Sequence, residues 1–254
     1  MKKQMEKEVL SSWERCIKKC IPDRLSSPRI ILLKETSKLT ADNELLVSIF
    51  EQVVKSIDHF ITINHLFLLT NPDGNLLAEI GTKTVLEMAK KFNIEIGTSF
   101  SEESIGTNAI ALAMKLKKPV YLFPEQHYCD VLKRWYCYAV PLNVRGEIKG
   151  CLDISTVEQT MKKELIAITQ LLAEKIMNEY SVAGSPRISM EIELNSQQLT
   201  VLKLLSQGLT ATAVALETGI SVNTVKYHKK KIFRELEVQS TGEAVAKAIN
   251  SGLI

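Results

Sequence analysis

The chain has 254 residues, enough for one large domain or two smaller ones. Hydrophobic residues make up 45% and charged residues 24%, a balance typical of a globular protein that excludes disorder over most of the length. The formal net charge of +3 does not by itself indicate a nucleic-acid partner, so only a local concentration of basic residues would do so.

Apolar residues follow helical spacing in some stretches of the chain and form short runs in others. Helical spacing predicts helices over residues 3–20, 41–58, 83–92, 106–117 and 159–180. Short runs predict strands over residues 64–70, 75–80, 120–123, 136–144 and 147–155. Turn residues join these strands into two hairpins, with Asn71-Pro72-Asp73-Gly74 in the first and Arg145-Gly146 in the second. Hairpins mixed with helices predict an α+β fold, in which helices flank an antiparallel sheet.

The composition also predicts the domain organisation. Residues 1–40 are expected to form an N-terminal helix and a connector, and residues 41–181 the α+β domain. Residues 182–192 include Ala183-Gly184-Ser185-Pro186 and are expected to be a linker. Residues 193–254 are expected to form a separate all-α domain.

Capping residues divide this last segment into four helices. Asn195 and Gln198 form the pattern of a capping box, as do Ser240 and Glu243. The remaining signals are Gly208 at the end of the first helix, Thr210 before the second, and Gly219 and Ser221 before the third. A helix, a turn containing glycine and a basic amphipathic helix are the parts of a helix-turn-helix.

The third of these helices, over residues 221–236, concentrates the positive charge. From residue 190 onward there are 7 Lys/Arg and 6 Asp/Glu, and five of the 7 basic residues lie between Lys226 and Arg234. At 3.6 residues per turn the apolar residues share one face of this helix. The opposite face carries Asn223, Lys226, Tyr227, Lys230 and Arg234. This pattern favours a helix that binds a groove of double-stranded DNA.

The segment resembles the LuxR-type helix-turn-helix family over residues 190–254. The residues that carry the resemblance are Leu194, Val201-Leu202, Leu205, Gly208, Thr210, Ala215, Ile220-Ser221, Thr224-Val225-Lys226, His228, Leu236, Val238, Ala244-Val245 and Gly252-Leu253. Among the departures, Glu237 stands where the family usually has a glycine that ends the helix.

The resemblance implies roles for particular residues. Lys226, Tyr227 and Lys230 would reach bases in the major groove, and Arg234 shares their face of the helix. The residues expected to face phosphates are Thr210, Ser221, Asn223 and Thr224. The fourth helix would form a dimer contact through Ala244, Val245 and Ala248. The implied partners are double-stranded DNA, a second copy of the chain and RNA polymerase.

Residues 41–180 resemble a GAF sensory domain of the kind that heads acetoin-catabolism-type activators. The residues that carry this resemblance are Ser12-Trp13-Glu14-Arg15-Cys16, Ser101-Glu102, Gly106-Thr107-Asn108-Ala109-Ile110, Pro119-Val120, His127-Tyr128, Trp135-x-Cys137, Ala139-Val140-Pro141 and Gly150-Cys151-Leu152-Asp153-Ile154-Ser155. Those activators also carry a central ATPase, but this chain has no G-x-x-x-x-G-K-[ST] motif.

The GAF resemblance implies a small-molecule pocket under a lid formed by residues 97–108 and 124–135. Pockets of this kind are mostly apolar and carry a few polar groups. The polar candidates are Asn108, His127, Tyr128, Trp135, Tyr138 and Asp153. For any one of these residues, a place in the ordinary core or on the surface is the competing interpretation. A packed, sealed interior would shift weight from ligand sensing to the cysteines.

The five cysteines contain no C-x-x-C pair, as expected for a reducing cytoplasm. Cys16, Cys129 and Cys137 are candidates for a redox switch. His127, Cys129, Cys137 and Cys151 match no established metal-site spacing, so no metal is expected. The N-terminal residues carry acids and no apolar segment, so no signal peptide is expected.

These patterns together predict a cytoplasmic transcription regulator rather than an enzyme. The GAF-like domain would sense an unidentified small-molecule effector or a redox signal, and would control a dimer of helix-turn-helix domains. The alternative is a ligand- or metal-binding sensor whose C-terminal domain contacts proteins instead of DNA. This alternative rests on the fact that surface helices are commonly charged on one face.

Overall fold

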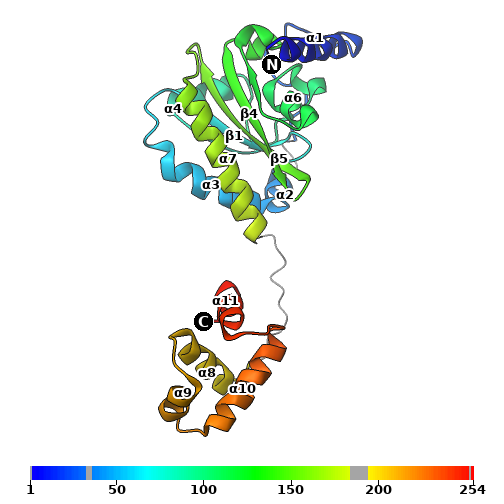
Figure 1. Ribbon diagram of the computed structural model, residues 1–254. Helices are drawn as coiled ribbons and strands as arrows, with labels where there is room; N and C mark the ends of the chain where they lie inside the picture. The colour runs from blue at the N-terminus through cyan, green and yellow to red at the C-terminus, as the bar shows by residue number, and fades with distance from the viewer. Residues whose placement is uncertain (1, 33–35, 184–193, 252) are drawn as a thin grey trace. The chain divides into compact units, whose positions relative to one another are not determined.

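The computed structural model describes residues 2–32, 36–183, 194–251 and 253–254. The chain divides into two compact units, one ending at Ala183 and the other comprising the rest of the chain. Each unit is described separately below (Figure 1). Among the described residues, no helix is long and apolar enough to cross a membrane.

The N-terminal unit is built on one five-stranded sheet. Its strands are β1 (Leu66–Thr70), β2 (Leu76–Gly81), β3 (Val120–Leu122), β4 (Trp135–Val144) and β5 (Glu147–Val157). They lie in the order β2-β1-β5-β4-β3, and every neighbouring pair is antiparallel. The predicted α+β class with an antiparallel sheet is therefore confirmed, as are the hairpins β1–β2 and β4–β5.

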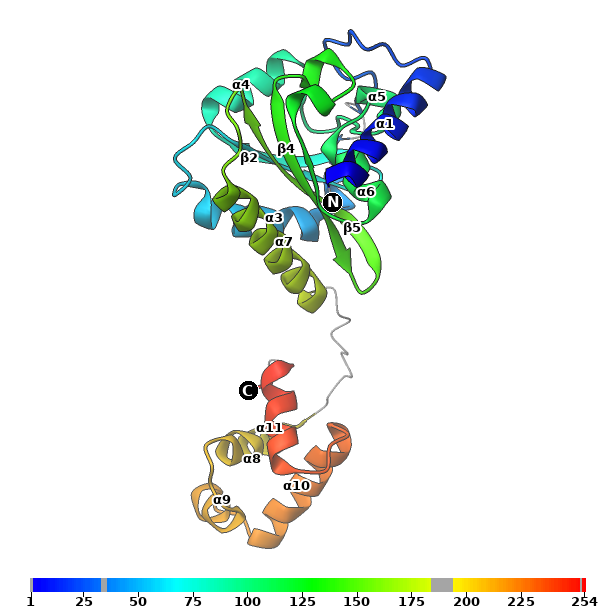
Figure 2. The same cartoon turned by 45° about the horizontal axis from the view of Figure 1, so that its top comes forward.

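Helices cover both faces of this sheet. They are α1 (Lys2–Lys18), α2 (Thr36–Ala41), α3 (Glu44–Asp58), α4 (Lys83–Lys91), α5 (Glu102–Ile105), α6 (Ala109–Leu116) and α7 (Lys163–Ala183), with short 3₁₀ turns η1 (Pro124–Gln126) and η2 (Asp130–Leu132). Helices α3 and α7 lie side by side on one face (Figures 1 and 2). Helix α6 packs on the opposite face, against β3, β4 and β5.

Alternation along the strands feeds two hydrophobic cores, one on each face of the sheet. In β1, Leu66 and Leu68 belong to the core on the α6 side, whereas Phe67 and Leu69 belong to the core on the α3/α7 side. Successive side chains of a strand point to opposite faces, so a strand that is covered on both faces is apolar throughout. This explains why β1 reads as a continuous apolar run in the sequence.

The N-terminal helix is an integral part of this unit, contrary to the expected boundary at residue 40. Val9 and Cys16 of α1 are buried in the same core as Leu66 and Leu68 of the sheet. The expected helix over 41–58 starts at Glu44, after the separate helix α2. At the other end, residues 182–183 of the expected linker belong to α7, and residues 184–192 lie outside the described residues.

The C-terminal unit contains the four expected helices around a core of its own. They are α8 (Ser196–Ser206), α9 (Ala211–Thr218), α10 (Val222–Glu235) and α11 (Thr241–Asn250). Val201, Val214 and Val225, one from each of the first three helices, are buried together. The predicted capping box at Asn195 is present, since Asn195 and Gln198 each donate a backbone N–H to the other's side-chain oxygen.

Candidate functional site

Helix α10 has one buried face and one exposed basic face. Val225 and Ile232 are buried in the C-terminal core. The helix begins after Ser221, whose Oγ accepts a hydrogen bond from the Thr224 backbone N–H at 3.0 Å. Gly219, at φ +69°, forms the turn that separates α9 from α10. The cap and the turn fix the start of the helix, and therefore which side chains face outward.

The residues predicted to meet DNA all reach the surface of the C-terminal unit. Thr224 is half-buried, and the others are exposed, namely Thr210, Ser221, Asn223, Lys226, Tyr227, Lys230 and Arg234. Tyr227 is 56% exposed, unusually open for a large aromatic ring. Within the described part of the chain, no carboxylate forms an ion pair with Lys226 or Lys230. Their charges are therefore available to a negatively charged partner.

The other two lysines of α10 make contacts with aromatic rings. The Lys229 Nζ lies 5.5 Å from the centre of the Phe233 ring, and the Lys231 Nζ lies 5.2 Å from the centre of the Tyr227 ring. Both lysines are half-buried. Their aliphatic parts pack on the unit while the amines reach outward, so these side chains are less free to reach a groove than Lys226 and Lys230.

Helix α11 does not present the residues predicted for a dimer contact. Ala244 and Ala248 are fully buried in the core of their own unit, where α11 packs against α8 and α10. Val245 is half-buried against the same core. The prediction was wrong for the two alanines because the apolar stripe of α11 is used inside the unit. Its outward face instead carries Ala246 and Ile249, of which Ile249 is 58% exposed.

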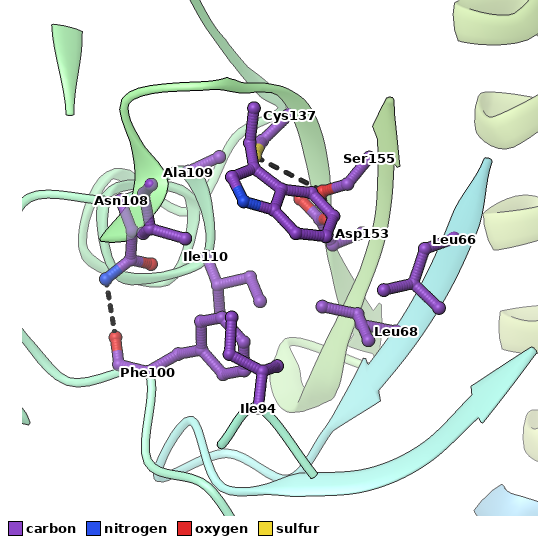
Figure 3. A pocket seen from close by; sticks show the side chains of 12 residues that line it. Leu66, Leu68, Ile94, Phe100, Asn108, Ala109, Ile110, Cys137, Asp153 and Ser155 are labelled. Atoms are coloured by element: carbon purple, nitrogen blue, oxygen red, sulfur yellow. Dashed lines mark hydrogen bonds between the residues drawn. The ribbon is translucent and has the colours of Figure 1, made fainter. Parts of the chain in front are cut away.

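The N-terminal unit contains a buried cavity between the sheet and α6. Side chains from β1, β4 and β5 form its floor, and the start of α6 and the loops near it form its cover (Figure 3). The lining consists of Leu66, Leu68, Ile94, Phe100, Asn108, Ala109, Ile110, Leu132, Trp135, Cys137, Asp153 and Ser155. Most of these side chains are apolar, and none is basic.

Three of the six predicted pocket residues line this cavity, namely Asn108, Trp135 and Asp153. Asn108 caps α6, since its Oδ1 accepts from the Ala111 backbone N–H at 2.9 Å. Its Nδ2 donates to the carbonyls of Phe100 and Gly106. Asn108 therefore has little hydrogen-bonding capacity left for a ligand, and its role is to hold the cover of the cavity in place.

The other three predicted residues do not line the cavity. Tyr138 lies on the opposite face of the sheet, where its hydroxyl donates to Gln170 Oε1 of α7 at 3.1 Å. The Tyr128 hydroxyl donates to the Ile21 carbonyl at 3.2 Å. His127 is fully buried outside the cavity, and burial lowers its pKa from 6.5 to about 4. Tyr138 and Tyr128 therefore have ordinary structural roles, whereas His127 is not the surface residue of the competing interpretation, and among the described residues neither of its ring nitrogens has a hydrogen-bond partner.

Asp153 and Trp135 contribute the unsatisfied polar atoms of the cavity. Asp153 is 2% exposed, and its Oδ2 accepts from Ser155 Oγ at 2.7 Å. Among the described residues, its Oδ1 has no hydrogen-bond partner, and neither does Nε1 of Trp135. Burial raises the pKa of Asp153 from 3.8 to about 7. A buried acceptor and a buried donor without partners are costly, so their presence in one cavity calls for a functional reason.

The interior is nearly closed. The cavity has a volume of about 20 Å³, enough for about one water molecule. A larger occupant would require side chains of the cover to move. Phe100 and Ile110 are the candidates, because they also line a groove on the surface formed by the 72–74 turn, α5 and α6.

The cysteines are poor candidates for a redox switch. Cys16, Cys129 and Cys137 are all buried. Burial raises the pKa of the Cys16 thiol, raises that of Cys129 to about 12, and raises that of Cys137 well above its ordinary value. The thiolate is the reactive form, so these environments suppress oxidation. The described residues contain no group of three or more His, Cys, Asp or Glu side chains placed to hold a metal ion.

Helix α1 holds the cover of the cavity in place, a feature that the sequence did not predict. Arg15 donates to both carboxylate oxygens of Glu102 on α5, at 2.8 Å and 2.5 Å. Ser12 donates to the same carboxylate and shares a hydrogen bond with Thr107. Trp13 Nε1 donates to the Gln126 carbonyl at 3.1 Å. The stretch Ser12–Cys16 carried part of the GAF resemblance, so a signal was present although its structural role was not apparent.

Gly106 allows this cover to close. It adopts φ +69°, a region that L side chains rarely occupy. A Cβ atom at this position would lie 2.7 Å from the Cys129 Sγ and 3.1 Å from the Tyr128 ring. Glycine is therefore required where the α5–α6 junction meets the 128–129 segment.

Comparisons with known proteins agree with both units. The sequence profile of bacterial regulatory proteins of the luxR family matches residues 193–248. The transcriptional regulatory protein YdfI of Bacillus subtilis (strain 168) is 34% identical over 207 residues, which cover 72% of this chain and 95% of YdfI. The fold and the matched residues define a helix-turn-helix regulator with a GAF-like N-terminal unit. The chain belongs to the luxR family of bacterial transcriptional regulatory proteins.

The similarity to activators extends over the N-terminal unit as well. The acetoin dehydrogenase operon transcriptional activator AcoR of the same Bacillus strain is 25% identical over 197 residues. The alignment covers 76% of this chain and 32% of AcoR, so the chain spans about a third of the length of that relative. The Escherichia coli DhaR(N)–DhaL crystal structure has the same fold over 69% of this chain and 61% of its own, with a TM-score of 0.65 and 18% identity.

Proposed function

We propose that this protein binds operator DNA as a dimer through α10 and that a small molecule in the N-terminal cavity controls this binding. The observation that carries the DNA-binding role is the exposed face of α10, on which Lys226 and Lys230 have no carboxylate partner among the described residues. A helix of 14 residues is about 21 Å long, so it can lie in a major groove about 12 Å wide.

The cavity supports the sensory role. Asp153 and Trp135 have buried polar atoms without partners in an apolar setting, which favours a small-molecule ligand. The raised pKa values of the buried thiols favour ligand sensing over redox sensing.

The proposed partners follow from this role. Two half-sites bound by a dimer multiply affinity and specificity, so we expect a second copy of the chain and an operator with two-fold symmetry. RNA polymerase is the expected partner in transcription, and the cytoplasm is the expected location.

Replacing two lysines of α10 tests the DNA-binding role. We expect Lys226→Ala/Lys230→Ala to weaken binding to a duplex from the region upstream of the gene by at least about tenfold. The dependence of log affinity on log salt should become shallower, because two positive charges that displace counterions from the DNA are lost. Fluorescence anisotropy at several salt concentrations measures both quantities.

Lys203→Ala/Lys247→Ala is the matched control. It removes the same net charge from α8 and α11 of the same unit. This variant should keep most of the affinity. If the α10 variant binds the duplex as tightly as the parent with the same salt slope, α10 does not bind DNA, and a protein-contact role for the C-terminal unit is favoured instead.

A further inference from the structure

We propose that Lys231 is a positioning residue for DNA recognition, which holds the ring of Tyr227 so that the ring contacts the methyl group of a thymine in the major groove. The inference rests on the proposed DNA-binding role of α10 and names the base that one position of this helix reads. It also gives a role to a lysine that is not among the predicted DNA contacts.

Tyr227 is an exposed aromatic residue near the start of α10. It is the sixth residue of the helix Val222–Glu235, and it is 56% exposed. In a helix-turn-helix, residues from the N-terminal part of the second helix contact the edges of the bases. An aromatic ring that is open to water on this part of the helix is therefore placed to contact a base.

Lys231 holds this ring through a cation–π contact. Its Nζ lies over the Tyr227 ring, 5.2 Å from the ring centre. Residues four apart lie on the same side of a helix and helical side chains lean toward its N-terminus, so Lys231 reaches back over the ring one turn before it. The ring also meets the buried ring of His228, with centres 5.8 Å apart and planes at 65°. These two contacts favour one orientation of Tyr227 before DNA is bound.

A side chain that is already held in one orientation loses less conformational freedom when it binds, which increases the affinity. Among the described residues, the Tyr227 hydroxyl makes no hydrogen bond that could hold the ring instead. In the same part of the chain, Lys231 forms no ion pair that would draw its ammonium group away from the ring. The contact between these two side chains is therefore the feature that sets the orientation of the exposed ring.

The chemistry of the Tyr227 side chain selects thymine. In the major groove, thymine presents a methyl group beside the O4 acceptor. The phenol of Tyr227 has an apolar ring and a hydroxyl donor, which match these two features. Guanine presents two acceptors there, which suit the ammonium groups of Lys226 and Lys230 instead. We therefore expect a T·A pair at the position that Tyr227 faces.

Removing single methyl groups from the DNA tests this contact. The full chain is used to select bound duplexes from a pool with a random segment of about 20 base pairs, which is two helical turns. Each thymine of the duplex that binds most tightly is then replaced by deoxyuridine, which lacks only the methyl group. At one position in each half-site we expect this replacement to weaken binding about fourfold, the effect of exposing one buried methyl group.

The ratio of the affinities for the thymine and uracil duplexes is measured within each variant, so a general loss of charge does not change it. Tyr227→Ala should lower this ratio to about one, whereas Tyr227→Phe keeps the ring and should keep the ratio. Lys231→Met keeps the length of the side chain but not its charge, so we expect a ratio below about two. Lys231→Arg keeps a cation over the ring and should keep the ratio of the parent.

Lys229→Met is the matched control. The Lys229 Nζ lies 5.5 Å from the centre of the Phe233 ring, so this variant removes the same charge and the same kind of contact from the same helix. It should weaken binding to both duplexes and keep their ratio. Equal ratios in Lys231→Met and Lys229→Met would overturn the positioning role, and the ratio of the parent in Tyr227→Ala would overturn the thymine contact.

The same selection separates this inference from the proposed function. A selected duplex can depend on Lys226 and Lys230 and yet contain no thymine whose methyl group affects binding. In that case the Tyr227 ring contacts the sugar–phosphate backbone, and only this inference is wrong. If the parent protein selects no duplex, the proposed DNA-binding role is wrong and this inference is overturned with it.

Discussion

Asp153 is expected to make the stability of the N-terminal unit depend on pH. Burial raises its pKa from 3.8 to about 7, so the folded protein keeps a proton that the unfolded chain releases above about pH 4. The free energy of unfolding therefore falls as pH rises from about 4 to about 7, by roughly 4 kcal/mol in all. Asp153→Asn should remove this loss, as urea unfolding at several pH values would measure.

His127 acts in the opposite direction over much of the same range. Its pKa falls from 6.5 to about 4 on burial, so the unfolded chain binds the extra proton, and stability falls as pH decreases from about 6.5 to about 4. The effects of the two residues on the free energy of unfolding partly cancel. The difference in this free energy between the Asp153→Asn variant and the parent therefore isolates the contribution of Asp153. Asp42→Asn, at an exposed carboxyl between α2 and α3, is the matched control. An Asp153→Asn profile parallel to that of the parent would contradict the assignment.

The alternation of side chains along strands explains which pocket residues the sequence could predict. Trp135 and Tyr138 were both expected in the pocket, but they are three positions apart on β4 and so point to opposite faces. The same rule links Asp153 with Ser155, a lining residue that the sequence analysis missed. Phe100 belongs to the predicted lid over residues 97–108 and does line the cavity. Ile94 comes from a loop outside that lid, and no spacing rule predicts the path of a loop.

At the scale of secondary-structure elements, the backbone just after α10 is strained at one residue, and a substitution there can relieve the strain. Glu237 has φ +49° where the family usually has glycine. Its backbone N–H donates to the Arg234 carbonyl, and that of Val238 donates to the Phe233 carbonyl, which is the hydrogen-bond pattern of a Schellman motif. Glycine adopts this conformation without steric cost. We expect Glu237→Gly to stabilise the C-terminal unit by about 1 kcal/mol, measured by chemical denaturation.

Replacing a glutamate by glycine inside a helix should instead lower the stability. Glu217 is exposed near the end of α9, where glycine would cost about 0.5–1 kcal/mol of stability. Glu217→Gly is therefore the matched control. A loss of stability in both variants would show that the carboxylate of Glu237 contributes more than its backbone strain costs.

The hairpins and helices could be predicted from residues close together in the sequence, whereas the way they pack against one another could not. The two hairpins followed from turn residues such as Gly74 and Gly146, both of which adopt positive φ. The strand order β2-β1-β5-β4-β3 joins hairpins far apart in the chain, and no pattern within either hairpin encodes it. Likewise, α1 reads as an ordinary amphipathic helix, and its ion pair from Arg15 to Glu102 becomes evident only when the chain is folded.

At the scale of the whole molecule, the two hydrophobic cores of the N-terminal unit are separate from the core of the C-terminal unit. Each unit therefore has its own source of stability. The small net charge of the chain does not reveal that the exposed basic face lies in one unit and the apolar cavity in the other.

Two units with separate cores predict two calorimetric transitions, each sensitive to substitutions in its own unit. Asp153→Asn at about pH 8 should raise the transition of the N-terminal unit, because it removes a buried carboxylate. Glu237→Gly should raise the other transition, by about 4–8 °C for a gain of 1 kcal/mol in a unit of this size. A single transition shifted by both substitutions would mean that the two units unfold together and are not independently stable.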